Sequence, residues 1–160
     1  MAEFKNTLKY ITTYGNQVEQ EIETRLFNLG KVASGKLYDS IGYKIVNGEK
    51  GYKLQFFMAD YGKFVDKGSK PSKYADSEGG GTGKSKFITA LMKWCDIKGL
   101  PRGMAFPIRR KIWKEGQVPT NFFTIPTTRR QKQFQAGVKK NMAIDAEEIL
   151  AREYKKAKRK

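Results

Sequence analysis

The sequence contains no histidine, a single cysteine and few acidic residues. Without histidine, the usual imidazole base, histidine-ligated metal sites and Ser-His-Asp or Cys-His catalysis are excluded. Cys95 has no second cysteine to form a disulfide within the chain or a paired zinc site. No apolar run approaches the roughly 18 residues of a membrane helix, and the first ten residues lack the apolar core of a signal peptide. We therefore expect a protein without a membrane segment, made in a reducing compartment.

The charge is strongly unbalanced along the chain. Of 160 residues, 32 are Lys or Arg and 16 are Asp or Glu, which gives a net charge of +16. Residues 1–80 carry +2 and residues 81–160 carry +14, with the densest basic run at 152–160. Such a run attracts polyanions. Lysine outnumbers arginine 24 to 8, however, and arginine is the better indicator of specific phosphate or base recognition. Charge alone therefore leaves open whether this surface binds nucleic acid or is simply solvated.

The first half predicts a long helix followed by a hairpin. The 39% hydrophobic content and 20 aromatic residues are enough for a folded core. Apolar residues recur every three or four positions over 4–29, and Gly30 is a plausible stop. Period-two alternation over 43–46 and 52–58 flanks the glycine-containing turn 47–51. We therefore expect an α+β fold in which a long N-terminal helix packs on a small antiparallel sheet.

The second half predicts mainly helices. Residues 59–68 form a short helical turn that ends at Gly68, and the glycine-rich stretch 69–84 forms a mobile loop. Helices are predicted over 85–98, 105–115 and 130–156, and the apolar stretch 121–126 is predicted as an edge strand. The predicted division is an α+β domain over 1–128, followed by a basic helical arm over 129–160.

The sequence contains few motifs that indicate catalysis or metal binding. The segment Glu78–Ser85 resembles a phosphate-binding loop, but Glu78 replaces the required first glycine and no strand precedes it. A flexible loop with Ser85 capping the next helix explains the segment better. Asp60 and Asp66 do not form a metal-binding set with other carboxylates, and Cys95 is interpreted as a small core residue. We therefore predict no catalytic, cofactor-binding or metal-binding residues, and no enzyme.

Three segments, taken in order, resemble the head–tail joining proteins of tailed bacteriophages, the neck, tail-completion or connector family. The first is GKLYDSI at 35–41, and the second is YGKFVDKGS at 61–69. The third is the basic stretch 107–116 followed by Thr-Asn-Phe-Phe at 120–123. The residues that carry the first two motifs are Gly35, Leu37, Ser40, Ile41, Tyr61, Phe64, Val65, Asp66 and Gly68. In this context Asp66 is expected to brace the turn, and Gly68 to allow a positive φ.

The resemblance implies a structural virion protein without enzymatic activity or cofactor. Six or twelve copies would form a ring in the neck, between the portal or adaptor proteins of the head and the tail proteins, around the DNA channel. The protein would be made in the host cytoplasm. The residues expected at subunit interfaces are Ile112, Trp113, Phe122 and Phe123. Those expected to contact DNA or acidic partner surfaces are Arg109, Arg110, Lys155, Lys156, Lys158, Arg159 and Lys160.

Two other functions remain open at this point. One is a free basic nucleic-acid-binding protein acting in the host cell, which would bind as a monomer or dimer and lose affinity steeply with salt. The other is a nucleotide-dependent enzyme built on the glycine-rich segment Gly79–Ser85. A direct nucleotide titration would distinguish that enzyme from a structural protein.

Overall fold

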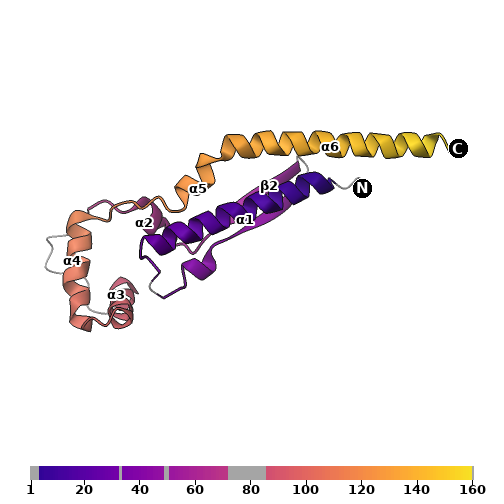
Figure 1. Ribbon diagram of the computed structural model, residues 1–160. Coiled ribbons are helices and arrows are strands. Elements are labelled where there is room, and N and C mark those ends of the chain that lie inside the picture. Colours follow the sequence, from indigo (N-terminus) through magenta and orange to yellow (C-terminus); the bar gives the residue numbers. More distant parts are fainter. Residues whose placement is uncertain (1–3, 33, 49–50, 72–85, 160) are drawn as a thin grey trace. The chain divides into compact units, whose positions relative to one another are not determined.

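The computed structural model describes residues 4–32, 34–48, 51–71 and 86–159 (Figure 1). It confirms the predicted mixed fold, with a long N-terminal helix, a two-stranded antiparallel sheet and further helices in the second half. The helices are α1 (Lys5–Asn28), α2 (Gly62–Lys67), α3 (Lys86–Ile97), α4 (Ala105–Glu115), α5 (Thr124–Arg129) and α6 (Gln131–Ala157). The strands are β1 (Gly42–Gly48) and β2 (Gly51–Phe57), and two short 3₁₀ helices span Tyr38–Ser40 and Arg102–Met104.

The chain divides into two compact units. The hairpin unit comprises Met1–Ile22, Gly42–Phe57 and Thr124–Lys160. The helical unit comprises Glu23–Ile41 and Met58–Phe123. The boundary therefore falls within α1, so that this one helix contributes residues to both units.

In the hairpin unit, α1 packs against the sheet through its apolar stripe. Ile11, Val18 and Ile22 are at most 1% exposed, as the periodicity predicted. Gly15 lies on the same side, where a Cβ atom would collide with the ring of Tyr43 on β1. The Tyr43 hydroxyl donates a hydrogen bond to Asn16 Oδ1 at 2.6 Å. The glycine thus lets the strand approach the helix closely, which explains its presence inside a long helix.

The hairpin lies where the alternation predicted it, and its strand pairing extends to Gly48 and Gly51, which the sequence placed in the turn. Pairs run from Gly42↔Phe57 to Gly48↔Gly51, and Tyr43 faces Phe56 with ring centroids 6.0 Å apart. Tyr43 and Ile45 are half-buried, while their neighbours Lys44 and Val46 are exposed. One face of the sheet is therefore partly buried and the other is exposed to solvent, as alternating side-chain directions along a strand require.

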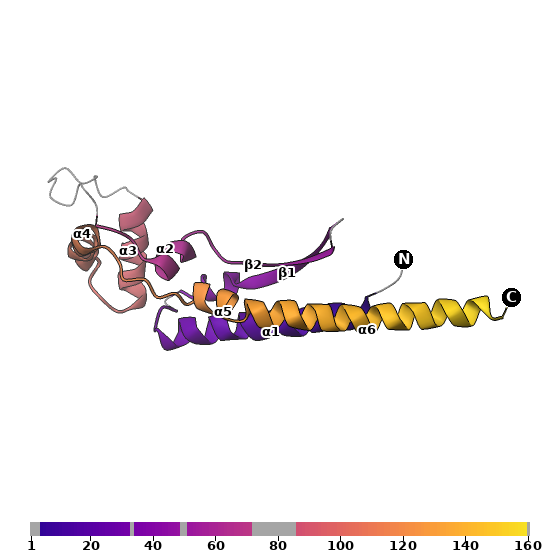
Figure 2. The same cartoon turned by 90° about the horizontal axis from the view of Figure 1, so that it is seen from above.

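The long helix α6 runs alongside the first part of α1 in the opposite direction (Figures 1 and 2). Its Phe134 ring lies 4.6 Å from the Tyr14 ring, centroid to centroid. Further along α6, the Asp145 carboxylate accepts hydrogen bonds from the backbone N–H groups of Asn6 and Thr7 at 2.9 and 2.8 Å. Asp145 thus caps the first turn of a helix that is distant in sequence.

The helical unit has its own core between α3 and α4. Ile88, Cys95 and Ala105 are fully buried, and Leu91, Met92, Trp94 and Ile108 pack around them. The Arg102 guanidinium pairs with both carboxylate oxygens of Asp96, with Nε 2.8 Å from Oδ1. Both helices lie where the sequence predicted them, and Cys95 is a buried free thiol.

The predicted edge strand at 121–126 is wrong. Asn121 adopts a positive φ of 51°, which turns the chain, and α5 begins at Thr124. Pro126 then lies in the first turn of α5, where its missing N–H removes no intrahelical hydrogen bond. The predicted loop at 69–84 lies mostly outside the described residues, and the proposed boundary at residue 128 stays a prediction.

Candidate functional site

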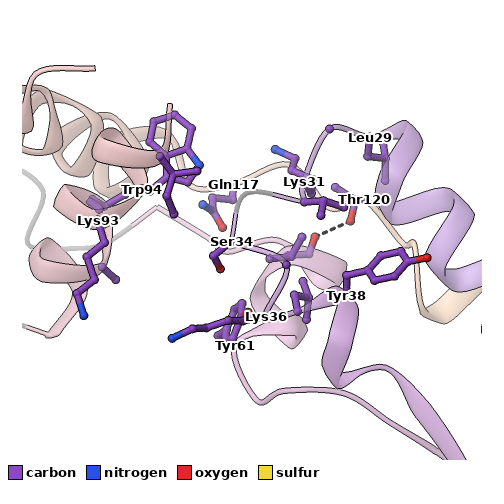
Figure 3. A pocket seen from close by; sticks show the side chains of 18 of the residues that line it. Leu29, Lys31, Ser34, Lys36, Tyr38, Tyr61, Lys93, Trp94, Gln117 and Thr120 are labelled. Atoms are coloured by element: carbon purple, nitrogen blue, oxygen red, sulfur yellow. Dashed lines mark hydrogen bonds between the residues drawn. The ribbon is translucent and has the colours of Figure 1, made fainter. Parts of the chain in front are cut away.

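A large groove lies within the helical unit (Figure 3). Its volume is about 1280 Å³. The lining comes from the segment after α1, from α2, α3 and α4, and from residues 117–120. Side chains such as Leu37, Trp94 and Ile112 make most of the lining apolar.

The charged groups of the groove are all basic. Lys31, Lys36 and Lys93 contribute to its lining, and all three are exposed. We call them the lysine rim. No aspartate or glutamate lines the groove within the described part of the chain. The groove therefore combines an apolar floor with a positive edge.

Two tyrosines at the groove stay neutral at physiological pH. The Glu23 carboxylate, which accepts a hydrogen bond from the Tyr38 hydroxyl at 3.3 Å, raises the pKa of Tyr38 above its usual value. Burial, and then the nearby Asp39 carboxylate, raise the pKa of Tyr61. Both hydroxyls thus stay protonated, the Tyr38 proton being donated to Glu23, and the positive charge of the lysine rim is not offset by phenolate.

The first family-like segment is hydrogen-bonded to the residues just before the second and packs against Gly62 within it. Ser40 Oγ donates to the Leu37 carbonyl at 2.7 Å and accepts a hydrogen bond from Ala59 N–H at 2.9 Å. A Cβ atom on Gly62 would come within 2.8 Å of the Leu37 side chain, so the backbone of α2 approaches that residue closely. Gly35 has a positive φ of 73°, and Leu37 and Ile41 are buried.

Asp66 connects the second family-like segment to the third. Its side chain is 1% exposed, and Oδ1 accepts a hydrogen bond from the N–H of Phe123 at 2.8 Å. The Asp66 carbonyl accepts hydrogen bonds from the N–H groups of Thr120 and Asn121. Thr120 Oγ1 donates to the Val65 carbonyl at 2.7 Å. Asp66 was predicted to brace its own turn, and the structure instead shows it joining that turn to residues more than 50 positions away.

Two glycines allow a close backbone contact beside this brace. Ser69 and Gln117 form an isolated antiparallel bridge with N···O distances of 3.0 and 2.9 Å. Gly68 and Gly116 precede these two residues and have φ values of 70° and 76°. A Cβ on either glycine would collide with a carbonyl oxygen across the bridge. The positive φ of Gly68 is confirmed, whereas the pairing of the two glycines was not predicted.

The expected interface residues occupy different environments. Ile112 lines the groove, while Trp113 is half-exposed and lies under the guanidinium of Arg109, 4.6 Å from its ring centroid. Phe123 is half-buried. Phe122 is 0% exposed and belongs to the interior of the chain, because the Asp66 hydrogen bonds fix the adjacent backbone and direct this ring inward. The prediction that Phe122 lies at a subunit surface is therefore wrong.

The remaining predicted residues are mostly surface residues. Phe64 is 62% exposed, and Arg110 is exposed on α4. The expected basic contacts near the end of the chain are exposed residues in or just after α6, and Lys160 lies outside the described residues. Lys156 Nζ pairs with Glu153 Oε1 at 2.7 Å. Arg109 and Arg110 belong to the helical unit, and the basic end of α6 belongs to the hairpin unit.

The described residues give little support for a metal site or a membrane-spanning helix. No three His, Cys, Asp or Glu side chains gather there as a metal-binding group, and none of the helices described is long and apolar enough to cross a membrane. Asp60 is exposed and lies 3.6 Å from Lys63. The phosphate-loop-like segment Gly79–Ser85 falls outside the described residues. Comparisons with protein-family models, curated proteins and solved structures found no match to this chain.

Proposed function

We propose that the chain is a non-catalytic ring subunit of the neck of a tailed bacteriophage, joining the head to the tail around the DNA channel. One observation carries this proposal. Three segments that resemble the connector family, spread over residues 35–123, all contribute to one groove in the helical unit. The first segment is held to the residues just before the second by the Ala59 N–H donating to Ser40 Oγ, and the second is held to the third by the Phe123 N–H donating to Asp66 Oδ1.

The surface at the groove supports a role in assembly. Val118 is 86% exposed, Ile97 51% and Tyr61 47%, and all three line the groove. Contiguous exposed apolar surface with a polar edge is typical of sites where proteins bind one another. A ring requires such a surface on every copy, because each subunit has a neighbour on both sides.

Immunogold electron microscopy of purified virions of the encoding phage tests the proposal. Gold particles directed at this chain should lie at the head–tail junction, and an antibody to the major capsid protein serves as the positional control. Mass spectrometry of the same particles should find about six or twelve copies, as the resemblance implies. Recovery of the chain only from the soluble host lysate, with none in the particles, would overturn the proposal.

The second candidate function is binding of nucleic acid as a free protein. The observation that favours it is on α4, where the Arg109 guanidinium stacks on Trp113 and lies 5.9 Å from the Phe106 ring centroid. Basic and aromatic side chains on one helix face can contact phosphates and bases. Arg110 extends the basic character of this helix.

Fluorescence anisotropy with a labelled 30-mer duplex and a single strand, over a salt series, distinguishes the two functions. A free binder should retain submicromolar affinity near 0.15 M salt, whereas non-specific contact should be about micromolar or weaker there. Arg110→Ala should weaken a dedicated binder by several-fold. Lys44→Ala removes one exposed charge from the hairpin and serves as the matched control.

A further inference from the structure

One face of α6 is left uncovered near its C-terminal end. Leu150 is 70% exposed and Tyr154 is 69% exposed. Glu147 and Ala151 are also exposed, and the four positions lie on one side of the helix because they are spaced by three or four residues. We call these four residues the α6 stripe. Asp145, which caps α1, and Glu148, which reaches Asn6, point to another side of the helix.

The neighbourhood of the α6 stripe is acidic in an otherwise basic half of the chain. Residues 145–153 contain four of the six acidic residues of the half 81–160 and a single basic residue, Arg152. Arg152 lies 3.6 Å from Glu148. The α6 stripe thus presents two large apolar side chains and the carboxylate of Glu147, whereas Asp145 and Glu148 lie on another side of the helix and Glu153 pairs with Lys156.

The groove of the helical unit has the complementary properties. Its lining is mainly apolar, and the charged lining residues in the described part of the chain, Lys31, Lys36 and Lys93, are all positive. Its volume of about 1280 Å³ exceeds the roughly 300–1,000 Å³ of common small-molecule pockets and suits a row of helix side chains. An amphipathic helix in an apolar groove is a recurrent mode of protein recognition.

We propose that the α6 stripe of one copy docks in the groove of a second copy, with Leu150 and Tyr154 on the apolar floor and Glu147 facing the lysine rim. The proposal deepens the neck function and rests on it. Because the two surfaces differ, the contact is heterologous, so each copy offers its stripe to one neighbour and its groove to another. Contacts of this type close into rings when the rotation between copies permits.

Disulfide trapping between two preparations tests the contact. One carries Leu150→Cys, and the other, with a different tag, carries Ile97→Cys in the groove. Under mild oxidation, the mixture should give a heterodimer that contains both tags. Val46→Cys replaces Ile97→Cys as the matched control, since Val46 is an apolar residue of β1 that is 38% exposed and does not line the groove. The native Cys95 is buried and is present in every sample.

A charge-reversal pair gives an independent measurement by sedimentation velocity. Glu147→Lys should weaken self-association by about threefold to tenfold, and Lys93→Glu in the same chain should restore most of it. Glu115→Lys, on α4 and outside the groove lining, makes the same charge change and should have less effect. Equal weakening by both reversals, without rescue, would overturn the contact.

The double variant that carries Leu150→Cys and Ile97→Cys distinguishes docking between two copies from docking within one copy. Disulfides between chains support the proposal, and a disulfide within a monomer refutes it. The results also distinguish failure of the docking contact from failure of the neck function. Gold at the head–tail junction without trapping overturns only the docking contact, whereas trapping with no chain in the particles overturns the neck function.

Discussion

Asp145→Ala tests how strongly one carboxylate fastens α6 to the start of α1. Asp145 is 2% exposed, and it accepts the N–H groups of Asn6 and Thr7 and, at 2.6 Å, the Thr7 hydroxyl. Loss of a helix cap costs about 0.5–2 kcal/mol. Loss of a hydrogen bond to a charged group costs about 1.5–3 kcal/mol. We therefore expect the free energy of unfolding to fall by about 2–4 kcal/mol.

Urea unfolding followed by circular dichroism at pH 7 measures this loss through the linear dependence of stability on denaturant. Glu148→Ala is the matched control, because its carboxylate makes exposed contacts, with the Asn6 side chain at 3.3 Å and with Arg152 at 3.6 Å. It should cost no more than about 1 kcal/mol. A stability for Asp145→Ala within about 0.5 kcal/mol of the unchanged protein would refute the capping role.

The same carboxylate gives a pH dependence. Burial alone would raise the pKa of Asp145, but the hydrogen bonds from Thr7 and Asn6 outweigh it and hold the pKa below its usual value. In the unfolded chain the pKa is about 3.9. The stabilisation is therefore fully present above that value and is lost as the pH falls through the lower pKa of the folded state. The difference in stability between the unchanged protein and Asp145→Asn should narrow in acid, and a difference that stays constant to pH 2 would contradict this.

The remaining predictions concern the helical unit and use the same unfolding assay. Gly68→Ala should cost at least about 2 kcal/mol more than Gly99→Ala. Both glycines have a φ near 70°, but only the Cβ at Gly68 meets backbone atoms, so equal costs would contradict a steric role. Phe122→Ala should cost about 3–5 kcal/mol because its ring is fully buried. Phe123→Ala should cost clearly less, because its ring is only half-buried and its N–H bond to Asp66 is kept.

The elements that the sequence predicted correctly have strong local periodicity and clear stops. In α1 the apolar side chains recur at helical spacing, and in the hairpin they alternate around a glycine-containing turn. Those patterns arise because each element buries one face, and burial depends on positions close together in the chain. The same reasoning placed α3, α4 and α6 within a few residues of their observed bounds.

The groove could not be predicted in this way. The Asp66–Phe123 hydrogen bond, which joins segments that line the groove, spans 57 residues of sequence. The Asp145–Thr7 bond of the hairpin unit spans 138. Such polar contacts produce no periodic pattern in the sequence. A signal was present for α5, however. Thr124 and Pro126 are residues that favour the first turn of a helix, and the apolar stretch before them concealed this start.

The net charge bears differently on assembly and on binding of nucleic acid. Copies that each carry +16 repel one another, and salt screens this repulsion beyond about 8 Å at physiological ionic strength. Binding of a polyanion instead weakens with salt, because releasing counterions into a more concentrated salt solution is less favourable. Within a neck ring, the DNA in the channel would supply the negative charge that neighbouring copies lack. In the proposed docking contact, the Glu147 carboxylate of the α6 stripe and the lysine rim fix which surfaces meet, since electrostatic complementarity determines register more than affinity.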